Sequence, residues 1–446
     1  MGKRWRRLAL VLSVGMAAEP LAAQDVDWAR TADEAVRALQ EYVRIDTSNP
    51  PGRTTAAADF LTRRLEAEGV AVTRYESAPG KAIVLARLKG AGRAKPILIL
   101  HHMDVVPADA SRWKTDPFSG ALEDGHVWGR GSVDMKGTGI AHLLAFLTLK
   151  RQGVPLDRDV VLMAVPDEEI GGELGAAWTM EHHYAELDPE YVLDEGGFGS
   201  RDLFADGKLV YGISVAEKKM LWLRVTAEGV AGHGSQPHDK NPNDRLVKAL
   251  ARLLAEPMPG APVAILDTLR KEAGTLARNK YMNAIQNSTL SLTTVRSGVG
   301  EPPKVNVIPS IAQATLDCRL LPGVTRDTWL AEVKRRLADP ELKIETVYES
   351  EEPTVTTQDT PLYRALQAAI LRSDPGAVVA PILVPYGTDS NKFRPRGVKS
   401  YGITPVVYSA EIAASMHGDA ERFPAGEMGK AIRVLYEALR ETAGTR

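Results

Sequence analysis

The sequence predicts an α/β protein built on a mostly parallel sheet, into which a smaller α+β domain is inserted. Three runs of apolar residues, at 97–100, 160–165 and 191–193, show no polar side, as expected of strands that are covered on both faces. Acidic or histidine residues follow each run, and glycine-rich turns and helices come next. From about Ala216 the pattern changes to alternating strands and two helices without acidic strand ends, which indicates the second domain.

The expected elements follow from local patterns. A helix is predicted at 31–43, because Thr31 can cap it and Glu34 stands at the capping-box position. A second helix at 56–68 is stopped by Gly69. The other expected helices are 137–151, 175–186, 243–255, 327–338, 362–371 and 426–441, and the other expected strands are 70–75, 82–88, 220–227, 288–295 and 312–319. We therefore expect a main domain in two parts, 24–215 and 351–446, around an inserted domain at 216–350.

The N-terminus has the layout of a secretory signal peptide at 1–23. Four basic residues between Lys3 and Arg7 precede an apolar run at 8–18, and small residues follow at 21–23. The apolar run is too short to span a bilayer. We therefore expect an exported protein, periplasmic or secreted, with no membrane span after cleavage. An uncleaved N-terminal anchor is the alternative, because the residues at 19–20 blur the cleavage site.

Length and composition are those of an ordered globular protein with a large core. The chain has 446 residues, of which 44% are hydrophobic and 25% charged. The formal net charge of −2 becomes more negative if the basic N-terminal segment is removed. Such a balance gives no reason to expect a nucleic-acid partner.

The step His102-x-Asp104 stands directly after the strand at 97–100. Ligands of open α/β sheets bind beyond the carboxyl ends of strands, which is where this pair lies. Two residues at i and i+2 of an extended chain point to one side, so Asp104 can accept the second ring N–H of His102 and leave the other nitrogen for a metal. The pair alone is equally typical of a strand end with a solvated histidine.

Further acidic and imidazole residues follow other strands and loops. They are Asp134, Glu168, Glu169, Asp194 and His417. Each alone is more often a helix cap or a solvated group. Together they suggest metal binding, because carboxylates about 4 Å apart repel by roughly 4 kcal/mol per pair at an effective dielectric of about 20. Two Zn²⁺ would neutralise Asp134, Glu169 and Asp194, which leaves Glu168 free to act as a general base.

Ten motifs containing these residues resemble, in order, those of a family of di-zinc hydrolases. The family includes aminoacylase, acetylornithine deacetylase, succinyl-diaminopimelate desuccinylase and glutamate carboxypeptidase. The motifs are DTSNPPG, HHMDVVP, WGRGSVDMKG, DEEIGG, LDEGG, AGHGSQP, NVIP, DCRLLPG, YGTDS and MHGDAERFP. The similarity covers nearly the whole mature chain, and it implies a di-zinc exopeptidase-like catalytic domain with an inserted lid and dimerisation domain.

The resemblance implies a role for each of these residues. His102 and Asp194 would bind one zinc, Glu169 and His417 the other, and Asp134 would bridge them; Co²⁺ or Mn²⁺ are possible substitutes. Asp104 would orient His102. Glu168 would activate the bridging water and later protonate the leaving amine. The peptide bond after Asp134 would be cis.

The resemblance also implies a substrate site that involves the inserted domain. His233 would reach the site of a partner subunit and stabilise an oxyanion, so we expect a homodimer through the lid. Asn306 and Arg319 would hold a substrate carboxylate, with the backbone at Gly387 and Thr388 helping. Without the resemblance, His233 is typical of a surface histidine in a glycine-rich turn, and Arg319 of an arginine paired with a surface acid.

The predicted function is that of a zinc-dependent amidohydrolase or exopeptidase. Its substrate would be an N-acyl amino acid or a small peptide with a free carboxylate, cleaved by a metal-bound hydroxide that Glu168 activates. The alternatives are a dipeptidase or aminopeptidase that requires a free amine, and a catalytically silent binding protein on the same fold.

The predicted lid is longer than the commonest pattern of the family. The segment 256–287 is added after its first helix, and this length resembles the branch of carboxypeptidase S and the secreted N-fatty-acyl-amino-acid hydrolases. The apolar residues of the segment would line an acyl pocket or form ordinary lid core. They are Leu266, Leu269, Leu276, Tyr281 and Met282.

Overall fold

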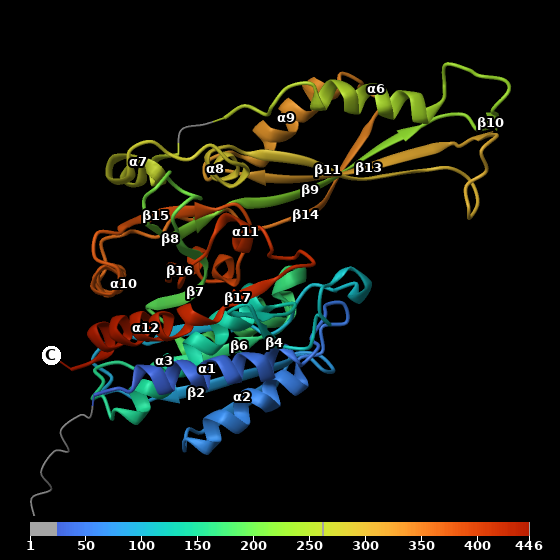
Figure 1. Ribbon diagram of the computed structural model, residues 1–446. Coiled ribbons are helices and arrows are strands. Elements are labelled where there is room, and N and C mark those ends of the chain that lie inside the picture. The colour runs from blue at the N-terminus through green and yellow to red at the C-terminus, as the bar shows by residue number, and fades with distance from the viewer. Residues whose placement is uncertain (1–24, 261–262, 446) are drawn as a thin grey trace, which may run out of the picture.

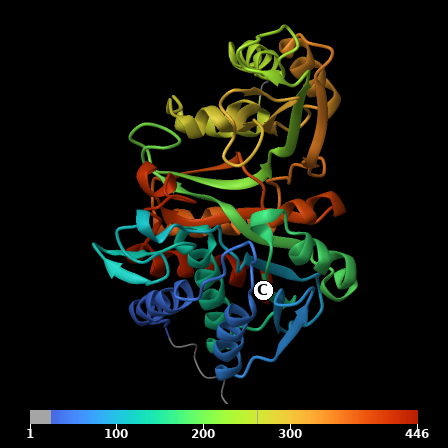
Figure 2. The same cartoon turned by 90° about the vertical axis from the view of Figure 1, so that its right-hand side faces the viewer.

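A computed structural model describes residues 25–260 and 263–445. The predicted signal peptide at 1–23 lies outside the described residues. The chain forms two tiers, a large sheet covered by helices and a smaller domain above it (Figures 1 and 2). Among the described helices, none combines the length and the apolar character needed to cross a membrane.

An eight-stranded sheet forms the centre of the larger tier, in the order β1-β2-β6-β3-β7-β16-β8-β15. The strands are β1 (Val72–Glu76), β2 (Ala82–Leu88), β3 (Ile97–His102), β6 (Val160–Val165), β7 (Tyr191–Ser200), β8 (Val210–Glu217), β15 (Val378–Val384) and β16 (Lys399–Val407). The central strands β6, β3, β7 and β16 run parallel, and β1, β2 and β8 introduce antiparallel pairs. The predicted α/β class is thus confirmed, and β15 and β16 bring the C-terminal part of the chain into the same sheet.

Helices cover this sheet. The main ones are α1 (Trp28–Val43), α2 (Thr55–Ala67), α3 (Gly137–Arg151), α10 (Pro361–Ser373) and α12 (Met428–Ala443), with short helices α4 (Trp178–His182), α5 (Tyr184–Leu187) and α11 (Ala410–Ala413). α12 packs against α1, α3 and α10. α3 is apolar on all sides because helices and sheet enclose it, so every residue from 137 to 149 is buried. Helix α1 begins earlier than predicted, because the side chain of Asp27, rather than Thr31, caps it by accepting the N–H of Arg30 at 3.0 Å.

A second, four-stranded antiparallel sheet builds the upper tier, in the order β11-β13-β9-β14. Its strands are β9 (Lys219–Glu228), β11 (Thr289–Ser297), β13 (Ile311–Leu320) and β14 (Lys343–Glu349), with helices α6 (Pro242–Leu254) and α9 (Arg326–Leu337). These elements share one apolar core, in which Trp329 and Leu250 take part. Two small sheets complete the fold: β10 (Gly232–His233) pairs with β12 (Val307–Ile308), and β4 (Ala121–Glu123), β5 (His126–Trp128) and β17 (Arg422–Pro424) form the other.

The segment added between α6 and β11 packs on the larger tier. Its helices α7 (Asp267–Ala273) and α8 (Lys280–Gln286) contact β15, beside which Figure 1 shows them. Leu266, Leu269 and Met282 are fully buried in the core of the central sheet. Tyr281 lies against Phe198 of β7, with ring centroids 5.9 Å apart. These apolar residues therefore pack into the core of the larger tier and not into the core of the lid sheet.

Candidate metal centre

The candidate ligands meet at the carboxyl edge of the central sheet. His102 is the last residue of β3, Glu168 and Glu169 follow β6, and Glu195 lies on β7. Because these three strands are parallel and adjacent, their carboxyl ends share one edge. Asp134 joins them from the turn before α3, where the Asp134–Met135 peptide is cis as the resemblance implied.

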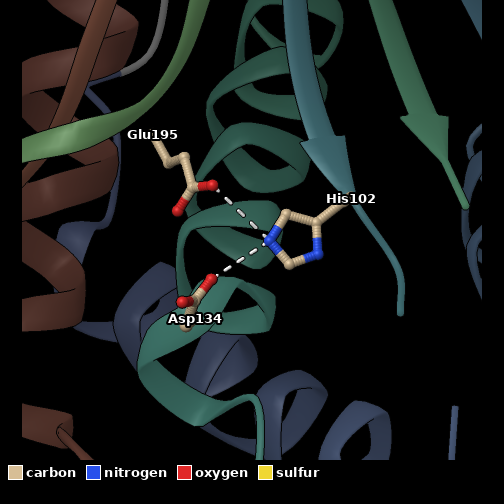
Figure 3. Close-up of side chains that lie close together, drawn as sticks. All are labelled: His102, Asp134 and Glu195. Atoms are coloured by element: carbon tan, nitrogen blue, oxygen red, sulfur yellow. Dashed lines mark hydrogen bonds and ion pairs between the residues drawn. The ribbon is translucent and has the colours of Figure 1, made fainter. Parts of the chain in front are cut away.

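A first group of donors consists of His102, Asp134 and Glu195 (Figure 3). His102 Nε2 lies 3.1 Å from Asp134 Oδ1 and 3.6 Å from Glu195 Oε1. His102 is almost fully buried, with 1% of its surface exposed, so this imidazole nitrogen faces the carboxylates rather than bulk water.

A second group shares one of these residues. His417 Nε2 lies 3.1 Å from Asp134 Oδ2 and 3.2 Å from Glu169 Oε2. The two oxygens of Asp134 therefore face different histidines, as a bridging carboxylate requires. In each group the ligand atoms lie within 4.8 Å of one another.

The donor chemistry of both groups fits divalent cations. Imidazole nitrogen and carboxylate oxygen are the ligands that Zn²⁺, Co²⁺ and Mn²⁺ accept, and each group offers one histidine and two carboxylates. In the first group the Nδ1 of His102 lies 2.9 Å from the carbonyl oxygen of Asp104, so it carries the ring hydrogen and leaves Nε2 free. The residues present can thus hold two ions.

The side chains of this cluster shift one another's pKa values. Burial alone would lower the pKa of His102, but hydrogen bonds with Asp134 and Glu195 raise it well above its usual value. Hydrogen bonds with Asp134 and Glu169 raise the pKa of His417 to about 11. Burial, together with the charge of Asp134, raises the pKa of Glu195 to about 8. Positive charge is therefore favoured at this position.

Asp194, which was predicted as a ligand, lies in neither donor group. This residue is buried, and its carboxylate accepts the backbone N–H of Ser390 at 3.0 Å and its hydroxyl at 2.8 Å. Adjacent residues of a strand point to opposite faces, so it is the neighbouring Glu195 that turns toward His102. The sequence offers two consecutive carboxylates here and no pattern that chooses between them.

Asp104 contacts His102 through a different group from the one predicted. Its carbonyl, not its carboxylate, holds His102, because the nearer carboxylate oxygen is 3.7 Å from Nδ1. The carboxylate instead accepts hydrogen bonds from Asn49 Nδ2 at 2.7 Å and from the backbone N–H of Glu168 at 3.2 Å. Asp104 thereby fixes both a candidate ligand and the turn that carries Glu168.

Glu168 belongs to neither donor group. Burial raises the pKa of Glu168 well above its usual value; the nearby His102 opposes this shift, and the Glu195 and Asp389 carboxylates add to it. A carboxylate beside the cluster, with an affinity for protons raised in this way, suits a role in proton transfer.

The predicted lid residues do not join this centre within one chain. His233 in β10 and Asn306 directly before β12 are exposed, and the N–H of Gly234 donates to the Asn306 carbonyl at 2.8 Å. Figure 1 places β10 at the far end of the upper tier. The hydroxyl of Ser235 lies 2.7 Å from His233 Nδ1.

The predicted carboxylate-binding residues have partners within the protein. Arg319 pairs with Asp317 of its own strand through two contacts, at 2.8 and 3.1 Å, which is the structural alternative noted above. Thr388 is buried, and its N–H donates to Glu217 at 2.6 Å. Gly387 packs close to Met220.

Comparisons with known proteins agree with this fold. The family model described as "Peptidase family M20/M25/M40" matches residues 98–441. Aminoacylase-1 of Mus musculus is 27% identical over 379 residues, covering 83% of this chain and 87% of the relative. "Probable carboxypeptidase S-like 2" of Dictyostelium discoideum is 27% identical, covering 78% and 72%. The M20 family metallo-carboxypeptidase Sso-CP2 from Sulfolobus solfataricus superposes with a TM-score of 0.71 at 22% identity, covering 92% and 99%.

The fold and the paired donor groups define a metallo-hydrolase. The chain belongs to the peptidase family M20/M25/M40, and it is a hydrolase that acts on amide bonds.

Proposed function

We propose that the chain is a zinc-dependent exopeptidase or aminoacylase that cleaves N-acyl amino acids or C-terminal residues of small peptides. The observation that carries this proposal is the pair of donor groups that share Asp134, with the carboxylate of Glu168 outside both groups. The names of the relatives, aminoacylase-1 and carboxypeptidase S-like, support the substrate class.

In the proposed mechanism, His102, Asp134 and Glu195 would hold one ion, and Asp134, Glu169 and His417 the other. The chemistry that such ions supply when bound is polarisation of a carbonyl and acidification of a water molecule. Glu168 accepts the proton of the attacking water and returns it to the leaving amine. Asp104 keeps Glu168 in place through the backbone N–H that it accepts.

A substrate panel tests this proposal. Chelator-treated protein is loaded with Zn²⁺, Co²⁺ or Mn²⁺ and assayed with N-acyl amino acids and with free dipeptides. We expect metal-dependent hydrolysis that favours acylated substrates with a free carboxylate. Preference for free dipeptides would instead favour a dipeptidase or aminopeptidase, and no turnover of either would favour a binding protein.

We also propose a homodimer through the lid. Strand β11 stands at the edge of the lid sheet, and most of its residues are exposed. Apolar side chains are exposed on this strand and in the loop after it, including Val295 at 54% and Val305 at 103%. An exposed apolar edge strand is a natural surface for pairing with a second copy. Sedimentation of the full chain should give twice the monomer mass.

We further propose export, which rests on the signal-like segment at 1–23. Fractionation of the producing cells should place the protein outside the cytoplasm and shortened near residue 23. Full-length protein in the cytoplasmic fraction would contradict this.

A further inference from the structure

We propose that Glu421, together with Arg130, is a positioning residue that holds Asp134 and His417 in place for the second ion. Glu421 is a fully buried carboxylate in the loop before β17, and it lies in neither donor group. The inference deepens the proposed function, and it rests on the proposed two-ion centre.

All contacts of the Glu421 carboxylate come from the turn that presents Asp134. One oxygen accepts the backbone N–H groups of Val133 at 2.9 Å and of Asp134 at 3.0 Å. The other accepts the N–H of Gly131 at 3.0 Å and Nη1 of Arg130 at 2.6 Å. One carboxylate thus fixes the backbone of the residue that both donor groups share.

The same arrangement reaches His417. Nη2 of Arg130 donates to the carbonyl of His417 at 3.1 Å. His417 has a φ of +59°, which a non-glycine residue adopts at some cost, so this peptide needs support from its surroundings. Arg130 and Glu421 are 2% and 0% exposed, so water does not compete for these bonds. Two segments 290 residues or more apart in the chain, at Gly131 and Arg130 on one side and Glu421 on the other, are thereby held in one geometry.

Only a carboxylate satisfies this environment. The four partners are three backbone N–H groups and a guanidinium, all of them donors, and they divide between both oxygens. In Glu421→Gln an amide NH₂ would replace one acceptor and face donors, which leaves buried groups unpaired. The turn carrying Asp134 would then lose its fixed position relative to His417.

The test is a calorimetric titration of Zn²⁺ into the full chain, from which a chelator has first removed bound metal. For Glu421→Gln and for Arg130→Lys we expect the second ion to bind at least about tenfold more weakly, as is usual when a residue that holds a metal ligand in place is lost. The affinity for the first ion should fall less. The isotherms should approach that of His417→Ala, which lacks a ligand of the second group. If Glu421→Gln does not fold, Arg130→Lys decides, because it keeps the charge and loses the reach to His417.

Glu217→Gln is the matched control. Glu217 is also buried, and it pairs with Arg394 and accepts the backbone N–H of Thr388, but it contacts no candidate ligand. It should keep both zinc affinities even if its melting temperature falls. Equal loss in this control, or wild-type zinc affinities in the Arg130 variant, would overturn the inference. A wild-type protein that binds fewer than two ions would instead overturn the proposed centre, and the inference with it.

Discussion

The sheet edge that carries the candidate metal ligands differs from the lid tip that carries His233. At the edge, the side chains already face one another within one chain, and the buried carboxylates of Asp104 and Glu421 accept the backbone N–H groups of Glu169 and Asp134, respectively. At the tip, His233 and Asn306 are exposed and belong to neither donor group, and β10, which carries His233, lies at the far end of the upper tier (Figure 1). The comparison teaches that one chain brings the candidate metal ligands together, whereas the proposed role of His233 at this site would require a partner subunit or a domain movement.

The largest effect is expected at the edge. Glu168→Ala removes the proposed proton acceptor without touching either donor group, so kcat should fall by about 10²- to 10⁴-fold. Zinc content, measured by elemental analysis, should not change. A near-normal rate with zinc bound would show that proton transfer does not depend on Glu168.

At the tip, His233→Ala should lower kcat by about 10²- to 10³-fold if His233 stabilises an oxyanion in the partner's site. Zinc binding should be unaffected, because His233 lies outside the cluster. Mixing this variant with Glu168→Ala should recover part of the activity, since one hybrid site would be intact. Lack of any recovery would favour a site completed by domain movement within one chain.

The choice between Glu195 and Asp194 as a zinc ligand can be tested with variants of both residues. Glu195→Gln should weaken binding of the first zinc by more than the roughly 10- to 100-fold that loss of an outer-shell partner costs. Asp194→Asn is the matched control, because its side chain can still accept the bonds from Ser390. The reverse result, with only Asp194→Asn losing zinc, would restore the original assignment.

A smaller effect is expected at Arg319, where the lid meets the predicted carboxylate site. Arg319→Lys should raise KM for substrates with a free carboxylate by about tenfold, because a lysine cannot form the bidentate pair. Substrates whose carboxylate is amidated should bind both proteins alike. If KM is unchanged for both kinds of substrate, Arg319 serves only its pair with Asp317.

Continuous apolar runs made much of the fold predictable. The helix at 137–151 and the strand at 160–165 have the predicted bounds, because both segments are buried on every side. β15 and β16 were missed, since Pro381 and Gly402 interrupt their patterns. Packing requires that glycine: a Cβ on Gly402 would lie 1.7 Å from the carbonyl oxygen of Glu195.

Those parts of the site that depend on residue type could be predicted from the sequence, and those that depend on three-dimensional geometry could not. His102, Asp134, Glu169 and His417 were expected as ligands, and the structure brings all four together. The choice between Asp194 and Glu195 depends on which face of β7 turns to the cluster, which two adjacent acids do not reveal. Glu421 stood within a recognised motif, but its role depends on contacts with a turn far away in the sequence.

The most direct test of the account is anomalous diffraction from crystals grown with zinc. We predict two zinc peaks, one bounded by His102, Asp134 and Glu195, and the other by Asp134, Glu169 and His417. A single peak, peaks elsewhere, or a zinc ligated by Asp194 instead of Glu195 would contradict it.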